Sequence, residues 1–392
     1  MKAYYVEADW EPKSGYALSD WEKRTKRARR SNFVWKNIRA EVVDLDMPTP
    51  TEDQVLIKIG ACGVCGSDIS SLVMDEEGYT KFSTHLRLPV IMGHEFSGEV
   101  VEVGPKVIDL KVGDLVAVEQ IHWCGKCRGC RIGKPNQCSY VEELGLSKNG
   151  GFAEYAVIEE RFCCNINKLY EKLGDKLAAM EAGALVEPTC VAYSGMIING
   201  GGFRPGANIA VFGAGPIGLA AISIAKVSGA AAIFAFDTMP ARLVLAKEVG
   251  ADYTMNPLEL KKQGSSPCEQ LLELTEGLGI GMFVEATGNT SAVYSDILHC
   301  MDISAKIIQL GVGAKNPEID LTQLIIRNSS IQGSMGHAGN DIYPSVIRLM
   351  AAGKIDMRQI ATARYSIEKT SDAINAAAYG TQGKVLVGQY YK

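Results

Sequence analysis

The residues from Asn208 to Asp237 constrain the fold of this chain more than any other stretch. They read NIAVFGAGPIGLAAISIAKVSGAAAIFAFD, which is a short apolar strand, a glycine turn, a helix of small and aliphatic residues, and a second strand ending at an acid. The alternation continues, with strands expected at MFVEATG, AKIIQLGVG and SIQGSMG and helices at ARLVLAKEVGA and PCEQLLELTEG. This rhythm predicts an α/β fold in which the second half of the chain forms a doubly wound parallel sheet.

The glycine turn of this stretch has the spacing G-x-G-x-x-G and consists of Gly213, Gly215, Pro216, Ile217 and Gly218. In such turns the first glycine permits the tight bend, the second lets the backbone approach a pyrophosphate, and the third lets the helix pack on the strand. Phosphates are favoured there by the free N–H groups of the helix N-terminus. A carboxylate at Asp237 would accept hydrogen bonds from a ribose diol and repel a 2′-phosphate, which favours NAD over NADP.

A run of cysteines follows the spacing C-x2-C-x2-C-x7-C and consists of Cys124, Cys127, Cys130 and Cys138. Four thiolates at such spacing close a tetrahedral zinc site with no position open to a substrate. Bacterial iron–sulfur runs continue after three residues to a cysteine followed by proline, whereas here seven residues intervene and Ser139 follows. A zinc ribbon that contacts nucleic acid is the other alternative, and the acidic charge of the chain disfavours it. We predict a structural zinc.

A second group of residues has metal-binding chemistry and consists of Cys65, His94, Glu95 and Glu187. A thiolate, an imidazole and carboxylates suit zinc, and three protein ligands with one open position are typical of a catalytic site. Pro188 disfavours helical backbone before it, so we expect the Glu187 side chain to leave the helix line and point into a cleft. On the residues alone, GHE is a weak signal and Glu187 could equally be a surface carboxylate. Cys62 and Cys65 also form a C-x-x-C pair, but no thioredoxin-like context supports a redox dithiol.

The remaining segments give the outline of a β-rich unit around these motifs. Alternating apolar and polar residues at 41–45 and 54–59 predict antiparallel strands of a barrel or sandwich. The stretch WEKRTKRARR, in which six of the eight residues 23–30 are basic, is expected to be a solvated helix or loop, with a phosphate- or partner-binding patch as the alternative. We expect a helix and a lid-like loop at 67–88, a helix at 168–185, and a helix–strand–helix–strand series after about residue 340.

Composition limits the classes of partner. The 392 residues carry a net charge of −5 and 47% hydrophobic residues, which is typical of a compact globular protein without a global positive field for nucleic acid or anionic membrane. No signal pattern or membrane segment is evident, because the most apolar span, 208–236, is interrupted by glycines, a proline and a lysine. Eleven cysteines without an export signal indicate a reducing compartment, so we expect a cytoplasmic protein that binds a small molecule.

The motifs Cys65, GHE, the four-cysteine loop, LVEPT and GAGPIG, in this order, resemble the zinc-dependent medium-chain alcohol dehydrogenase family over essentially the whole chain. The Glu after the His and the Glu of VEP resemble the polyol branch, which includes sorbitol and threonine dehydrogenases. MDEEGY, EPTCVAYSG and GSMGHAG are most similar to the inositol-pathway scyllo-inosose dehydrogenases. The resemblance implies a GroES-like β-rich catalytic domain at 1–189, a Rossmann domain at 190–340, a return to the catalytic domain at 341–392, and a cleft between the domains.

The same resemblance implies roles for individual residues. Cys65, His94 and Glu187 would ligate a catalytic zinc, with Glu95 beside the ion. Ser67 would pass the proton of the substrate outward. The implied cofactor-binding residues beyond the glycine turn are Asp237, Arg242, Thr287, Gly311 and Val312. Further candidates for the substrate pocket are Tyr79, Glu119, Trp123 and His337, each of which could equally have a structural role.

One position departs from the pattern of the family. Many relatives place a His three residues after the relay serine, whereas this chain has Ser70 there. We hypothesise that a ribose hydroxyl, water and Ser70 complete the proton path. The motifs and the resemblance together predict a dehydrogenase of polyols, cyclitols or sugars that uses NAD and two zinc sites, one catalytic and one structural. The resemblance alone implies a homo-oligomer, a dimer or a tetramer. A threonine or simple-alcohol dehydrogenase is the alternative within this class, and a non-catalytic nucleotide-binding protein is disfavoured because the metal ligands are present.

Overall fold

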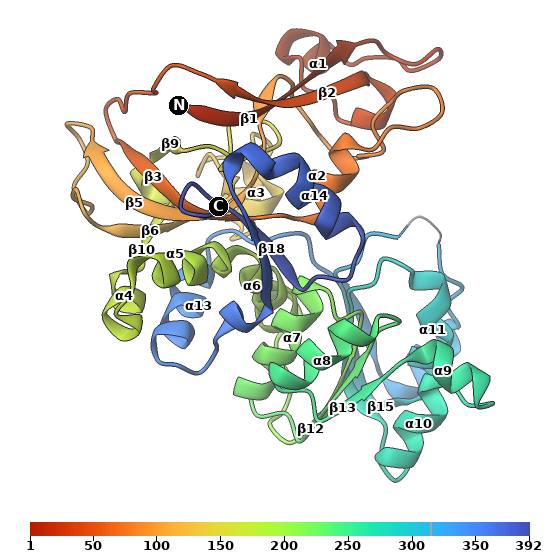
Figure 1. The fold of residues 1–392 in the computed structure, drawn as a ribbon. Coiled ribbons are helices and arrows are strands. Elements are labelled where there is room, and N and C mark those ends of the chain that lie inside the picture. Colours follow the sequence, from red (N-terminus) through yellow and green to blue (C-terminus); the bar gives the residue numbers. More distant parts are fainter. Residues whose placement is uncertain (314–315) are drawn as a thin grey trace. The chain divides into compact units, whose positions relative to one another are not determined.

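The computed structural model describes residues 1–313 and 316–392, and the chain forms two compact units (Figure 1). The first unit contains Met1–Glu187 together with Ala361–Lys392, and the second contains Pro188–Ile360. Both ends of the chain therefore build the first unit. The second unit is a continuous insertion between them.

The first unit is built mainly from antiparallel strands. Its seven-stranded sheet has the order β10-β6-β5-β3-β18-β17 with β9 also paired to β3, and a smaller sheet has the order β2-β1-β4. The strands of this unit are β1 (Lys2–Trp10), β2 (Trp35–Asp44), β3 (Gln54–Gly63), β4 (Val90–Ile91), β5 (Glu95–Val103), β6 (Leu115–Val118), β7 (Ile121–His122), β8 (Glu142–Glu143), β9 (Tyr155–Glu159), β10 (Cys163–Asn165), β17 (Ala361–Tyr365) and β18 (Lys384–Val387). Its helices are α1 (Asp20–Thr25), α2 (Gly66–Leu72), α3 (Arg128–Arg131), α4 (Asn167–Leu173), α5 (Lys176–Ala184) and α14 (Thr370–Ala378).

Strand β3 is the central strand of the first unit. It pairs with β5, β9 and β18, and its side chains from Val55 onward are buried with the single exception of the half-buried Lys58. The core beside it contains the fully buried rings of Phe96, Phe152 and Phe162. A strand that has neighbours on both edges and is packed on both faces carries apolar residues at successive positions, without alternating polar ones. This central strand ends at the first of the metal-binding motifs.

The second unit contains a six-stranded parallel sheet of order β13-β12-β11-β14-β15-β16. Its strands are β11 (Asn208–Phe212), β12 (Ala232–Phe236), β13 (Tyr253–Met255), β14 (Ile280–Glu285), β15 (Met301–Gln309) and β16 (Ser330–Gly333). Its helices are α7 (Pro216–Val227), α8 (Pro240–Glu248), α9 (Pro257–Lys262), α10 (Pro267–Leu274), α11 (Thr290–His299), α12 (Leu321–Arg327) and α13 (Ile342–Ala351). The strand order reverses between β11 and β14, where parallel sheets of this kind bind ligands. The prediction of a doubly wound parallel sheet is confirmed.

The helix expected at 168–185 is two helices. Helix α4 ends at Leu173, and α5 begins at Lys176. Asp175 is the N-cap of α5, and its side chain accepts a hydrogen bond from the N–H of Ala178 at 2.8 Å. An Asp in this position caps a helix N-terminus, which the apolar periodicity alone does not reveal. The predicted helix is therefore interrupted at 174–175.

The expectation that Pro188 would force Glu187 out of the helix line is wrong. Helix α6 runs from Val186 to Tyr193, so Glu187 and Pro188 both lie in its first turn. Proline is tolerated there because the first N–H groups of a helix have no partner within the helix. Glu187 is 6% exposed, and it is buried as a residue of the helix rather than by leaving it.

The basic stretch at 23–30 is only partly solvated. Lys23, Arg24 and Lys26 are exposed around α1, but Arg27 is 6% exposed. Among the described residues, no helix combines the length and apolar character that crossing a membrane requires.

Candidate active site and metal centres

Three of the predicted ligands meet in the first unit. The Sγ of Cys65, a ring nitrogen of His94 and a carboxylate oxygen of Glu95 all lie within 4.8 Å of one another. Cys65 precedes α2 at the end of β3, and His94 precedes β5, which pairs with β3 so that Gly63 is opposite Glu95. Pairing of two neighbouring strands therefore places the thiol and the imidazole side by side. Sulfur, nitrogen and oxygen donors at this spacing fit zinc.

Asp68 supports this group, and the sequence analysis assigned it no role. Its side chain is fully buried, and one oxygen accepts a hydrogen bond from the N–H of Cys65 at 2.8 Å. Its other oxygen lies 3.5 Å from Nδ1 of His94, as an ion-pair contact without hydrogen-bond alignment. A carboxylate at one ring nitrogen orients the other nitrogen toward a metal. The only local signal for this role is the position of Asp68, three residues after Cys65 at the end of the GSD sequence.

The electrostatics around His94 favour a cation. Burial lowers the pKa of His94, but the nearby Asp68 and Cys65 outweigh burial and raise this pKa well above its usual value. His94 itself is only 3% exposed. Surroundings that attract a proton to a buried imidazole also attract a metal ion.

Glu95 forms a buried ion pair with Lys384, which sequence reasoning missed. The Nζ of Lys384 lies 2.7 Å and 2.5 Å from the two carboxylate oxygens and donates to the carbonyl of Val64 at 3.0 Å. Both side chains are almost fully buried, at 1% and 0% exposed. Burial raises the pKa of Glu95, Lys384 acts in the opposite direction, and Glu187 adds to the increase. The pair gives the buried Glu95 carboxylate a lysine partner beside Cys65 and His94.

Glu187 lies close to this group without joining its tightest cluster. Its charge acts on both Glu95 and Lys384, and its side chain is buried in the first turn of α6. The set that lies within 4.8 Å contains Cys65, His94 and Glu95 but not Glu187.

The two serines after Cys65 point to different partners. Ser67 Oγ lies 3.4 Å from Nε2 of His94, so its hydroxyl is beside the metal-binding group. Ser70 Oγ donates to the backbone carbonyl of Ser67 at 3.1 Å. The hydroxyl of Ser70 therefore contacts the backbone of Ser67 and not its side chain. The predicted proton path through Ser70 stays a hypothesis.

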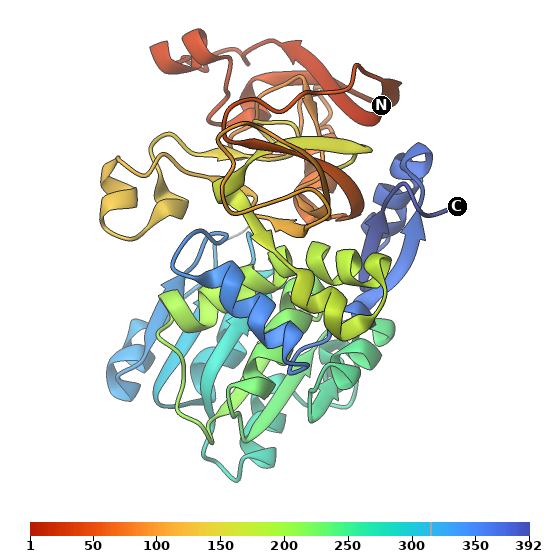
Figure 2. The same ribbon diagram turned by 90° about the vertical axis from the view of Figure 1, so that its left-hand side faces the viewer.

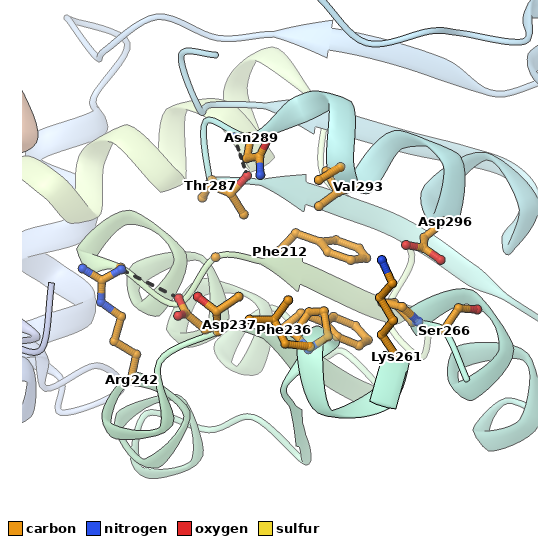
Figure 3. Close-up of a pocket in the computed structure, with 18 of the residues that line it drawn as sticks. Phe212, Phe236, Asp237, Arg242, Lys261, Ser266, Thr287, Asn289, Val293 and Asp296 are labelled. Carbon is orange, nitrogen blue, oxygen red and sulfur yellow. Dashed lines mark hydrogen bonds and ion pairs between the residues drawn. The ribbon is translucent and has the colours of Figure 1, made fainter. Parts of the chain in front are cut away.

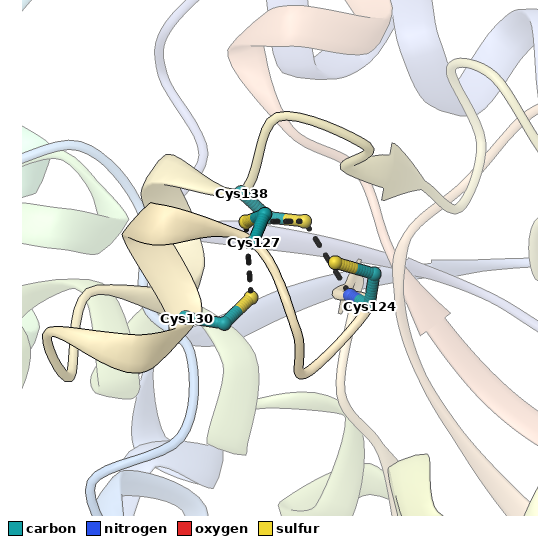
Figure 4. A group of neighbouring side chains, drawn as sticks. All are labelled: Cys124, Cys127, Cys130 and Cys138. Atoms are coloured by element: carbon teal, nitrogen blue, oxygen red, sulfur yellow. Dashed lines mark hydrogen bonds between the residues drawn. The ribbon is translucent and has the colours of Figure 1, made fainter.

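The four cysteines of the predicted structural site are gathered in one loop (Figure 4). Their sulfur atoms lie within 4.8 Å of one another, with Cys127 Sγ 3.5 Å from that of Cys130 and 3.7 Å from that of Cys138. A tetrahedral zinc with bonds of about 2.3 Å requires sulfur separations of about 3.8 Å. Backbone N–H groups of Cys130 and Ser139 lower the pKa of Cys127 to about 6. Figure 2 shows this loop, in gold, standing away from the strands of its unit.

The further candidates for the substrate pocket have mostly packing contacts. The ring of Tyr79 is buried and has Lys13 Nζ 4.5 Å from its centroid. Trp123 packs edge-on against Phe162 at 6.0 Å. In the second unit His337 is fully buried, with its ring 5.0 Å from that of Tyr343. Glu119 is also buried, and its N–H donates to the carbonyl of Phe162.

The glycine turn lies between β11 and α7 in the second unit. Gly213 has a φ of +92°, which other residues rarely adopt. A Cβ on Gly218 would lie 1.7 Å from the carbonyl oxygen of Gly213, so only glycine fits there. Gly215 is the N-cap of α7, with Pro216 and Ile217 in the first turn. The turn therefore presents free N–H groups to a phosphate.

A cavity of about 680 Å³ opens beside this turn (Figure 3). Asp237 and Arg242 lie at one end of it, with Arg242 Nη1 3.8 Å from a carboxylate oxygen of Asp237, and Lys261 and Asp296 lie at the other end. Asp237 also accepts hydrogen bonds at 2.8 Å from the N–H groups of Ala214 and Met239. A carboxylate has about four acceptor positions, so Asp237 can still bind a ribose diol.

The residues expected near the nicotinamide follow the carboxyl ends of β14 and β15. Thr287 lines the same cavity and donates through its N–H to a carboxylate oxygen of Glu285 at 2.8 Å. The N–H of Gly311 donates to the carbonyl of Glu285 at 2.9 Å. The side chain of Val312 is 86% exposed. Glu285, which is fully buried, thus organises this edge and was not foreseen from the sequence.

Comparisons with known proteins agree with this geometry. The alcohol dehydrogenase GroES-like domain matches residues 51–168, and the zinc-binding dehydrogenase family matches residues 216–352. The chain is 38% identical to scyllo-inosose 3-dehydrogenase of Thermotoga maritima, over 95% of this chain and 96% of that protein. It is 34% identical to L-threonine 3-dehydrogenase of Pyrococcus furiosus, over 88% of this chain and 94% of that protein. The solved structure of a candidate alcohol dehydrogenase from Thermotoga maritima matches with a TM-score of 0.93 and 34% identity, covering 98% of this chain and 99% of that one.

Proposed function

Since this chain belongs to the zinc-dependent medium-chain alcohol dehydrogenase family, we propose that it transfers a hydride between a secondary hydroxyl of a polyol, cyclitol or sugar and NAD. The observation that carries this proposal is the meeting of Cys65, His94 and Glu95 within 4.8 Å in a chain that also has the dinucleotide turn. The protein is an oxidoreductase with a GroES-like and a Rossmann-type domain.

We assign Cys65, His94 and Glu187 as ligands of a catalytic zinc, with Glu95 as a ligand that exchanges. When bound, the zinc supplies Lewis-acid chemistry that acidifies a substrate hydroxyl or polarises the matching ketone, while the nicotinamide carries the hydride. Asp68 orients the His94 ring through its contact at Nδ1. Lys384 keeps Glu95 paired while it is not a ligand. A second, structural zinc is assigned to the cysteine loop.

The proton of the substrate hydroxyl leaves through Ser67 in this proposal. Its hydroxyl is 3.4 Å from the His94 ring and can accept one proton while donating another. A bound dinucleotide would place a ribose hydroxyl near Ser67, and Ser70 would be the residue of this chain that passes the proton on toward water. The Ser70 hydroxyl can rotate away from the Ser67 carbonyl to take part.

The cofactor preference is proposed from Asp237. Its carboxylate, 8% exposed, can hold the ribose diol and would repel a 2′-phosphate. Arg242 lies 3.8 Å from Asp237, so its charge is partly neutralised and is less available to a phosphate. Thr287, Gly311 and Val312 are proposed to contact the nicotinamide.

A polyol or cyclitol is preferred over threonine as the substrate. The 38% identity to the Thermotoga maritima scyllo-inosose 3-dehydrogenase extends over 96% of that protein, against 34% identity to the Pyrococcus furiosus threonine enzyme. An inositol, the commonest kind of cyclitol, carries a secondary hydroxyl on every ring carbon and has no charged group to pair. Such a substrate needs hydrogen-bonding partners and the metal centre, without a dedicated anion site.

We further propose a homo-oligomer, a dimer or a tetramer, in the cytoplasm. Strand β16 is an edge of the parallel sheet, and the neighbouring α12 exposes Leu321, Ile325 and Ile326 at 64%, 78% and 69%. Pairing of two such edges would cover both the unpaired backbone groups and the apolar side chains. All eleven cysteines are free thiols, which fits a reducing compartment.

A panel of substrates tests the function. The zinc-loaded protein is mixed with NAD or NADP and with scyllo-inositol, myo-inositol, sorbitol, threonine or ethanol, and NADH or NADPH formation is followed by absorbance. We expect turnover with a cyclitol or alditol and with NAD. Turnover with threonine alone would replace the polyol by the alternative substrate class, and turnover with none of the five would contradict the proposal.

A further inference from the structure

A second cavity, outside the metal centres and the dinucleotide turn, lies beside the basic N-terminal stretch. Its volume is about 320 Å³, and its lining includes Trp21, Arg24, Arg27, Arg87, Tyr140 and Glu142. We call it the arginine pocket. Cavities of roughly 300 Å³ are at the small end of the range that holds small-molecule ligands.

The arginine pocket has an excess of positive charge. Three arginines line it against a single carboxylate, that of Glu142. Both oxygens of Glu142 are already bonded, one to Arg27 Nη1 at 2.8 Å and the other to Ser147 Oγ at 2.5 Å. The carboxylate is therefore committed to Arg27. Arg24 and Arg87 line the cavity with no ion pair to any described carboxylate.

Arg27 is the buried wall of the pocket. Its side chain is 8% exposed, and its Nη2 donates to the backbone carbonyl of Val141. Its Nε is buried without a hydrogen-bond partner. Burial lowers the pKa of Arg27, Glu142 opposes this, and the charge of Arg87 adds to the lowering. A buried guanidinium with an unused donor and a second cation nearby is stabilised by an anion.

Two aromatic rings complete the walls. The guanidinium carbon of Arg27 lies 5.3 Å from the ring centroid of Trp21. This cation–π contact fixes the position of the ring. Tyr140 directly follows the cysteine loop and is 64% exposed. Flat apolar faces beside guanidinium groups suit a ligand that carries a carbon ring next to its anionic group.

We propose that the arginine pocket binds a small soluble phosphate monoester of the size of a sugar phosphate, with Arg24 and Arg87 holding the phosphate and Trp21 and Tyr140 contacting the carbon skeleton. The planar guanidinium fork matches phosphate oxygens in a bidentate manner. A phosphate monoester carries close to two negative charges at neutral pH, which balance Arg24 and Arg87. The volume leaves room for one ring and excludes a dinucleotide. This site uses none of the residues assigned to zinc or NAD.

Calorimetry of the full chain tests the site. The zinc-loaded protein is saturated with NADH, so that the glycine turn is occupied, and is titrated with glucose 6-phosphate, inorganic phosphate or glucose. We expect glucose 6-phosphate to bind, inorganic phosphate to bind more weakly, and glucose not to bind. The variants R24Q and R87Q should each weaken binding about tenfold or more, since each removes a charge-assisted contact. Both side chains are exposed, so replacing them should leave the fold intact.

The matched control is R29Q. Arg29 lies 5.1 Å from the same Trp21 ring and carries the same charge, but it does not line the cavity. Binding in R29Q should stay within about threefold of the wild type, since only the distant field changes. Equal weakening in R29Q and R87Q would overturn the site, as would absence of binding in the wild type.

A second readout locates the ligand, and a vesicle arm separates two sources of phosphate. Glucose 6-phosphate should change tryptophan fluorescence in the wild type and not in Trp21→Phe; an unchanged response in that variant would contradict the pocket. Vesicles of phosphatidylcholine with phosphatidic acid should not bind the protein. Binding to these vesicles without binding to glucose 6-phosphate would replace the soluble ester by a lipid headgroup and overturn the proposal.

Discussion

Replacing Lys384 by methionine isolates the buried ion pair beside the candidate catalytic centre. Methionine keeps most of the volume and apolar stem of the side chain and removes its charge. Glu95 would then be buried at 0% exposed without its lysine partner, and the carbonyl of Val64 would lose its donor. Breaking a buried pair by removing one partner leaves an uncompensated charge, which is more costly than losing the attraction alone.

The magnitude follows from the geometry. With Nζ 2.7 Å and 2.5 Å from the carboxylate oxygens, the attraction is about 6 kcal/mol at an effective dielectric constant of about 20. Desolvation of the lysine offsets part of this value, and broken buried pairs cost about 3–5 kcal/mol in practice. We therefore expect K384M to lower the free energy of unfolding of the first unit by about 3–5 kcal/mol.

Tryptophan fluorescence during urea unfolding measures this loss. All four tryptophans lie in the first unit, at positions 10, 21, 35 and 123, so the signal reports that unit alone. The control is K176M, because Lys176 also pairs with a glutamate, Glu99, at 2.8 Å but with side chains 47% and 26% exposed. Exposed pairs contribute at most about 1 kcal/mol.

The double variant E95Q/K384M provides the decisive comparison. Removing both charges eliminates the buried unpaired carboxylate, so this variant should recover a large part of the stability lost in K384M. Equal losses in K384M and K176M would show that burial does not make the Glu95–Lys384 pair more important than an exposed pair. A double variant less stable than K384M would contradict the expected recovery.

Three further predictions concern other parts of the first unit. Asp68→Asn should weaken zinc affinity at the catalytic centre by about tenfold to a hundredfold, measured by competition with a chelator, while Asp114→Asn leaves it unchanged. Cys127→Ser should release one zinc and make the loop at 124–138 sensitive to limited proteolysis, whereas Cys163→Ser should do neither. Burial raises the pKa of Glu22, but hydrogen bonds from Arg29 and Ser19 outweigh burial and bring this pKa below its usual 4.5. The charged Glu22 therefore stabilises the fold at neutral pH. Glu22→Gln should lower the thermal stability most at neutral pH, and the loss should shrink as the pH falls below 4.5. A penalty independent of pH would contradict the Glu22 argument.

Features with a local signal could be predicted from the sequence. The dinucleotide-binding strand, glycine turn and helix follow one another directly in the sequence. The cysteine loop spans only residues 124–138. Both carry their chemistry at short, fixed spacings, so the motif and the structural element coincide. The same is true of the parallel sheet, because each strand alternates with a helix along the chain.

Features that depend on distant pairing could not be predicted. Lys384 contacts Glu95 across 289 positions of sequence, and it does so only because β3 pairs with β5 on one edge and with β18 on the other. In the sequence Lys384 reads as an ordinary lysine at the start of a strand. Pro188 led to a wrong prediction of non-helical backbone at Glu187. Its effect depends on whether a helix begins before or after it, which the sequence does not reveal. The arginine pocket likewise required Arg87 and Tyr140 to meet the basic N-terminal stretch.

Zinc content measured together with turnover shows whether Cys65 is a ligand of a catalytic zinc. Wild-type protein and Cys65→Ser are purified in parallel, and metal per chain is determined beside the rate of NAD reduction with the best polyol of the panel. We expect about two zinc ions in the wild type, about one in Cys65→Ser, and loss of turnover with folding and NADH binding retained. Wild-type turnover in Cys65→Ser, or the same zinc content in both proteins, would contradict this assignment.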